Sequence, residues 1–172
     1  MEQLKMKWET VPIDMPSLPD GCYMRSFKPG DEEDWCRCCI DGELGLNEVS
    51  KAEFNRIMAA DEKVEMRNIY FLVSGSHKIL GTITYQHSGI PGEAVIHMVG
   101  IIPSARGKGL ARYMMCYAMK KITEDGNTRA FLTTDDWRIP GIKAYFGVGF
   151  TPVINDDDMQ RRWDAVMSVI QV

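Results

Sequence analysis

The feature that most constrains the fold of this chain is an apolar segment that runs through a basic glycine turn into a long apolar helix. Residues 94–102, AVIHMVGII, are apolar apart from His97 and Gly100, as expected for a strand covered on both faces. The turn PSARGKG follows, and residues 110–122 are apolar around most of a helical circumference. The sequence therefore predicts a buried strand, a turn and a buried helix in immediate succession.

The turn has the chemistry of an anion site. The first N–H groups of a helix lack partners within the helix, and its dipole favours negative charge there. Glycines let the backbone approach a phosphate closely, and Arg106, Lys108 and Arg112 add positive charge. The spacing nevertheless fits neither the P-loop nor G-x-G-x-x-G, because Arg112 stands where the third glycine belongs. On the glycines alone, a plain strand–helix connector is the favoured interpretation.

The remaining segments predict one α+β domain, residues 1–172, with a mixed sheet. Turn and helix-start signals place the boundaries of the elements. Strands are predicted at 22–28, 69–74, 77–87, 93–102, 129–135 and 149–154. Helices are predicted to open at 31 and at 50, to run from the glycine turn to 124, and to span 139–147 and 159–172.

Composition excludes several classes of protein. A net charge of −4 over 172 residues argues against a general nucleic-acid binder. No apolar run has the length of a signal-peptide core or a membrane span, so the sequence predicts a cytoplasmic protein without membrane contact. Cys36, Cys38 and Cys39 lie in a predicted helix with no second ligand pair at zinc spacing, so we expect free thiols and no metal. A monomer and a homodimer both remain open.

Two separated motifs resemble a known family. Arg106-x-x-Gly109-x-Ala111 resembles the acyl-CoA signature Q/R-x-x-G-x-G/A of the GNAT superfamily of N-acyltransferases, and AYFGVGFTPV resembles its Tyr-x-x-x-Gly-Phe segment. The order of elements is similar to the GNAT fold, a mostly antiparallel sheet flanked by helices and splayed between the strands at 93–102 and 129–135. Three further blocks resemble one subgroup: Pro29–Trp35, Leu132–Arg138 and Arg162–Trp163.

The resemblance implies that acetyl-CoA is the co-substrate. Backbone N–H groups from Gly107 to Arg112 would hold its pyrophosphate, and the strand at Val99–Ile101 would pair with the pantetheine arm like an added strand. The implied cofactor residues are Val99, Gly100, Ile101, Arg106, Gly107, Lys108, Gly109, Leu110, Ala111 and Arg112. Gly100 is consistent with a bulge at the splay. One departure from the family is Arg138, where many members carry asparagine.

Candidate catalytic and acceptor residues follow from the same comparison. Tyr145 matches the tyrosine that protonates the departing CoA thiolate, and packing on its own helix is the alternative. Strand alternation places His97 on one face with Val99 and Ile101, where it could remove a proton from the amine, although a hydrogen-bonded core histidine is the slightly favoured alternative. Asp135 and Asp136 follow a strand and could attract an ammonium group or cap the next helix.

The functional hypothesis is an N-acetyltransferase that uses acetyl-CoA to acetylate a primary amine of a small molecule or peptide. A non-catalytic acyl-CoA-binding or sensing module on the same fold is the first alternative, and another phosphate-bearing ligand at the turn is the second. We expect the acceptor side to be built from the N-terminal helices and the loop at 88–93.

Overall fold

The computed structural model describes residues 2–40 and 45–170 of the chain. Its strands are β1 (Leu4–Glu9), β2 (Tyr23–Ser26), β3 (Ile69–Val73), β4 (Ile79–His87), β5 (Glu93–Ile101), β6 (Arg129–Thr134) and β7 (Thr151–Val153). Its helices are α1 (Glu32–Cys39), α2 (Lys51–Phe54, continued by a π-turn over Asn55–Ala59), α3 (Leu110–Glu124), α4 (Ile139–Phe146) and α5 (Asp157–Ile170). The predicted order of elements from residue 22 onward is confirmed, except that residues 41–44 and 171–172 lie outside the described residues.

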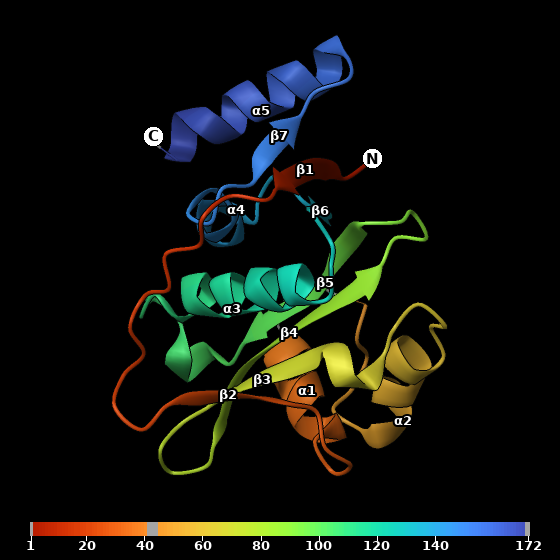
Figure 1. Cartoon of the computed structure of the whole chain (residues 1–172), viewed down its shortest axis with the longest axis vertical. Helices are drawn as coiled ribbons and strands as arrows, with labels where there is room; N and C mark the ends of the chain where they lie inside the picture. The colour runs from red at the N-terminus through yellow and green to blue at the C-terminus, as the bar shows by residue number, and fades with distance from the viewer. Residues whose placement is uncertain (1, 41–44, 171–172) are drawn as a thin grey trace.

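The strands form one seven-stranded sheet in the order β2-β3-β4-β5-β6-β1-β7. Among the described strands every neighbouring pair is antiparallel except β5 and β6, which are parallel. Helices α3, α4 and α5 pack into one core cluster and α1 and α2 into another, so the sheet carries helices on both faces (Figure 1). The predicted mixed, mostly antiparallel sheet flanked by helices is confirmed.

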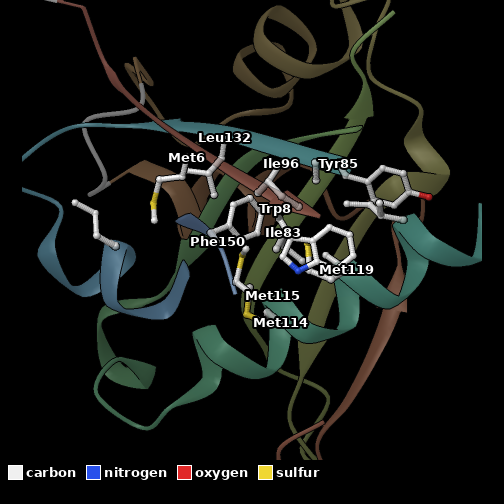
Figure 2. Packing of buried hydrophobic residues seen from close by; sticks show 14 of the residues in the cluster. Met6, Trp8, Ile83, Tyr85, Ile96, Met114, Met115, Met119, Leu132 and Phe150 are labelled. Carbon is white, nitrogen blue, oxygen red and sulfur yellow. The ribbon is translucent and has the colours of Figure 1, made fainter. Parts of the chain in front are cut away.

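The larger core lies between the sheet and α3. Figure 2 shows side chains of β1, β4, β5 and β6 meeting the methionines of α3. Met114, Met115 and Met119 are buried against this face of the sheet, as expected for a helix that is apolar around most of its circumference. Flexible thioether side chains fill irregular gaps well, which suits a helix that packs on several twisted strands at once.

Strand β1 is an element that the sequence analysis did not predict. Its residues alternate strictly between buried and exposed, with Leu4, Met6 and Trp8 in the α3-side core. It pairs with β6 on one side and with β7 on the other, antiparallel to both. The first described segment of the chain therefore lies inside the sheet, and Leu4 is the register partner of Thr134 at the end of β6.

The sheet opens between β5 and β6. Their parallel pairing covers only three register pairs, beginning with Glu93 and Arg129 and ending with Val95 and Phe131. Among the described strands, β6 beyond this point pairs with β1 alone, and β5 keeps only β4 as a partner. The predicted splay is confirmed. Of the residues of β5, only Ala94 and Ile96 are buried, so the expectation of a strand covered on both faces is wrong beyond the point where β6 turns away.

A β-bulge in β5 changes which side chains share a face. Met98 has a φ of 54°, and the register with β4 shifts so that His97 opposes Thr84 while Gly100 opposes Thr82. Two threonines separated by one residue lie on the same face of β4, so His97 and Gly100 share a face and Ile101 lies on the other. The prediction that His97 shares a face with Val99 and Ile101 is wrong for this reason.

Candidate functional site at the splayed strands

A cavity of about 650 Å³ lies between the end of β5, the glycine turn, the start of α3 and helix α4. Its lining is mostly apolar. All predicted cofactor residues line this cavity except Lys108, whose Nζ donates a hydrogen bond to the carbonyl of Ser104 at 3.2 Å. The cavity therefore brings together the predicted cofactor residues from Val99 to Arg112, which are up to 13 positions apart in the sequence.

The turn exposes the N-terminus of α3. Gly107 and Gly109 have φ values of 74° and 73°, and a Cβ at either position would meet no atom within 4 Å. Glycine is therefore required here by the left-handed backbone and not by crowding. No side chain of the described residues caps α3 at its first turn, so its leading N–H groups are available to an anion.

Gly100 is required for a different reason. A Cβ at this position would lie 2.4 Å from the carbonyl oxygen of Cys38 and 3.0 Å from the Sγ of Cys39, both on α1. The bulge expected at Gly100 is present, but it falls at Met98 and Val99, which together oppose one residue of β4. The close approach of α1 thus fixes glycine at position 100 beside the cavity.

Tyr145 stands at the junction of two cavities. It comes from α4 and lines the apolar cavity together with a second, mostly polar cavity of about 460 Å³. Burial raises the pKa of its phenol, and the positive charge of Arg138 opposes this rise. Gly141 lies one turn earlier on α4, and a Cβ there would be 3.5 Å from the Tyr145 Oη. The phenol is therefore protonated at neutral pH and placed between the two spaces.

The polar cavity lies in the opening between β5 and β6. Its lining comes from four places in the chain: Gln3, Ile96–Val99, Leu132–Asp135, and Arg138 with Tyr145. The Nε2 atom of His97 is buried without a hydrogen-bond partner among the described residues, and burial lowers the pKa of this imidazole. A neutral histidine at this position can accept a proton.

The two predicted aspartates have different surroundings. Asp135 lines the polar cavity, where its carboxylate accepts hydrogen bonds from Gln3 Nε2 at 3.0 Å and from Arg138 Nε at 2.8 Å. Asp136 lies outside both described cavities and forms a two-pronged ion pair with Arg162 of α5. Neither aspartate caps α4, whose N-cap residue is Arg138 and has no side-chain cap bond.

Gln3 and Arg138 are among the residues of the polar cavity that the sequence analysis did not assign to a site. Gln3 reaches it because β1 lies beside β6, and Arg138 reaches both cavities from the start of α4. None of the described lining residues comes from α1, α2 or the loop at 88–93, where we expected the acceptor side. The alternation of residues 4–9 was the signal that could have predicted β1.

Comparison with known proteins identifies the family. The model of the Acetyltransferase (GNAT) family matches residues 28–150, which include the glycine turn, the splayed strands and Tyr145. The chain belongs to the GNAT acetyltransferase family. The resemblance expected from the two motifs is confirmed.

Relatives and solved structures agree with this assignment. Mycothiol acetyltransferase of Pseudarthrobacter chlorophenolicus is 27% identical over 180 residues, a match that covers 95% of this chain and 50% of that protein. A protein of the same name from Arthrobacter sp. (strain FB24) is 27% identical over 174 residues, with the same coverage. The chain spans about half the length of these curated relatives.

Solved structures share the fold at lower identity. A GCN5-related N-acetyltransferase from Sphaerobacter thermophilus superposes with a TM-score of 0.70 at 21% identity, over 87% of this chain and 48% of that one. The ribosomal-protein-S18-alanine N-acetyltransferase of Escherichia coli gives 0.59 at 16% identity, over 77% and 79%. These likenesses show the GNAT fold.

Residues 2–40 and 45–170 contain no group of three or more His, Cys, Asp or Glu side chains that could hold a metal ion. The five cysteines are free thiols, and burial raises the pKa of Cys38 to about 12. None of the described helices combines the length and apolarity needed to cross a membrane.

Proposed function

We propose that this GNAT domain transfers an acetyl group from acetyl-CoA to a primary amine, with Tyr145 as the general acid. The position of Tyr145 carries the proposal, because one phenol borders both the apolar cavity and the polar cavity. Transfer of an acetyl group requires its two substrates to meet at one point. Tyr145 lies where the apolar cavity and the polar cavity share lining residues.

The described residues fit coenzyme A in the apolar cavity. The uncapped start of α3, with Gly107 and Gly109 in left-handed conformations, suits a pyrophosphate. The edge of β5 beyond Val95 has no strand partner on the β6 side, so the amide groups of a pantetheine arm can pair with it as an added strand would. The thioester of acetyl-CoA would supply the activated acetyl group.

The chain's own groups would carry the proton transfers. As the amine nitrogen bonds to the acetyl carbon, its proton passes to His97 Nε2, directly or through water. A backbone N–H near Val99 or Ile101 stabilises the negative charge that develops on the carbonyl oxygen. As the carbon–sulfur bond breaks, the Tyr145 hydroxyl donates its proton to the sulfur, and the products are an amide and free CoA thiol. The unpartnered Nε2 of His97 supports its role as the base.

The test is release of free thiol from acetyl-CoA in the presence of a broad panel of primary amines. Tyr145→Phe should lower kcat about 10²- to 10⁴-fold while the KM for acetyl-CoA changes little. The matched control is Tyr23→Phe, because Tyr23 is an exposed tyrosine on β2, away from both cavities.

An unchanged kcat in Tyr145→Phe would remove this residue from the mechanism. Tight binding of acetyl-CoA without turnover of any amine would instead support the non-catalytic binding or sensing module. Displacement of CoA by simple nucleotides would support another phosphate-bearing ligand at the turn.

A further inference from the structure

The polar cavity passes through the sheet from one face to the other. Val95 is the register partner of Phe131, and Lys5 is the partner of Thr133. By alternation along β5 and β6, His97, Thr133 and Asp135 therefore lie on the face opposite to the α3-side core. Tyr145 approaches the same cavity from α4, on the core side. An acceptor could thus enter from the face away from coenzyme A and reach Tyr145 through the opening.

Gln3 completes the outer wall of this passage. Leu4 pairs with Thr134, so the register of β1 and β6 brings residue 3 next to residue 135. The amide of Gln3 donates to one carboxylate oxygen of Asp135 at 3.0 Å, and Arg138 donates to the other at 2.8 Å. The orientation of the Asp135 carboxylate is fixed from both sides, and the amide oxygen of Gln3 accepts no hydrogen bond from the described residues.

The polar groups of the cavity suit hydroxyl groups on the acceptor better than they suit a second charged group on it. The carboxylate of Asp135 is already paired with Arg138, so the pair offers hydrogen-bonding atoms without a large net charge. The Oγ1 of Thr134 is buried without a partner among the described residues, which adds a group able to donate and accept. A hydroxyl group on a ligand also donates and accepts hydrogen bonds. A hydroxylated ligand can therefore pair with both the donors and the acceptors that line the cavity.

The size of the cavity limits the acceptor. A volume of about 460 Å³ lies in the range of small-molecule sites. An unsubstituted polyamine has no acceptor for the buried hydroxyl of Thr134, and burying that donor unpaired is unfavourable.

We propose that this cavity binds a small primary amine that carries hydroxyl groups, and that Gln3 is a specificity-determining residue that positions Asp135 against those hydroxyls. The inference rests on the proposed acetyltransferase function, because it assigns the acceptor class of that same site. It goes beyond that function because it assigns Gln3, which is far from every motif in the sequence, to the wall of the proposed acceptor site.

The experiment compares hydroxylated amines with unhydroxylated amines of similar shape. Serinol is compared with isopropylamine and glucosamine with cyclohexylamine, and alanine, putrescine and a short peptide with a free N-terminus complete the panel. We expect kcat/KM, calculated on the concentration of the neutral amine, to be about tenfold or more higher for the hydroxylated member of each pair, because each neutral hydrogen bond contributes up to about a tenfold preference.

Gln3→Ala tests the residue itself. It should raise the KM for the hydroxylated amine about three- to tenfold and leave the KM for acetyl-CoA and the melting temperature unchanged. Gln160→Ala is the matched control, because Gln160 lies exposed on α5 and its side-chain amide donates only to Asp164 among the described residues. Equal effects of the two substitutions would overturn the role of Gln3.

The outcomes separate this inference from the proposed function. Turnover that favours isopropylamine and cyclohexylamine, or the peptide, would overturn the inference and leave acetyl transfer intact. If no amine is acetylated, the proposed function fails, and calorimetric titration of glucosamine into the CoA-saturated protein decides the inference. Binding that is weaker in Gln3→Ala than in Gln160→Ala would then support the cavity assignment, and no binding would refute it.

Discussion

The substitution Gly100→Ala tests the packing that supports the candidate site. The new Cβ would lie 2.4 Å from the carbonyl oxygen and 2.7 Å from the carbonyl carbon of Cys38. These are backbone atoms of α1, so they cannot move aside as the end of a flexible side chain can. Restoring an ordinary contact of 3.4 Å or more requires α1 and β5 to separate by about 1 Å.

That separation would loosen the second core cluster. Helix α1 buries Trp35, Cys36, Cys38 and Cys39 in it, and overpacking a core of this kind costs about 1–3 kcal/mol. For a domain of this size, each kcal/mol lowers the melting temperature by about 2–4 °C. We therefore expect Gly100→Ala to melt roughly 3–10 °C below the unsubstituted protein.

Thermal unfolding followed by circular dichroism is the assay, with Gly75→Ala as the matched control. Gly75 has no left-handed φ, and a Cβ there would meet its nearest atom at 3.5 Å, so its effect should stay within about 0.5 kcal/mol. Equal melting of the two variants would refute the packing argument. Weaker binding of acetyl-CoA at an unchanged melting temperature would show that cofactor approach, and not α1, requires the glycine.

Two further predictions concern ionisable groups. Burial lowers the pKa of His97 below its usual 6.5, so the imidazole is neutral above this lowered pKa and its protonation should add an acid limb to kcat/KM, separate from the limb set by protonation of the acceptor amine; a pH–rate profile should show this added limb, and His97→Gln should remove it. Arg162 lowers the pKa of Asp136 below its usual 3.8, so the ion pair stabilises the fold fully above pH 3.8 and loses its effect as the pH falls through the lowered pKa. Asp136→Asn should therefore cost about 1 kcal/mol near neutral pH, a value kept small because the Asp136 side chain is partly exposed, and nothing in strong acid. Asp158→Asn, at an exposed ion pair with Arg161, is the control for chemical denaturation, and equal losses in both variants would contradict the assignment.

Local patterns predicted the elements whose signals are local. The succession of strand, glycine turn and helix from residue 93 to 124 is visible in apolar periodicity and in Gly107 and Gly109. The family followed from two motifs, each of which lies within one turn or one short segment. The cofactor side of the candidate site was predictable for the same reason, since most of its residues belong to one continuous stretch.

The acceptor side depends on contacts between distant parts of the chain. Strand β1 spans six residues, and its place between β6 and β7 depends on partners 120 or more positions away. The bulge at Met98 arises because two residues of β5 oppose one residue of β4, and no residue type in EAVIHMVGI marks the position. One extra residue reverses the alternation after it, so His97 and Ile101 point to opposite faces.

Arg162 joins in space two of the three blocks that resemble one subgroup, Leu132–Arg138 and Arg162–Trp163, although they are far apart in the sequence. Its guanidinium pairs with both carboxylate oxygens of Asp136 and also donates to the backbone carbonyl of Glu2 at 2.9 Å. One side chain of α5 thereby holds the residue that follows Asp135 and the residue that precedes Gln3. Asp135 and Gln3 form the outer wall of the polar cavity. Arg162 would therefore influence the acceptor site by holding the neighbours of these two residues in place, without contacting the acceptor itself.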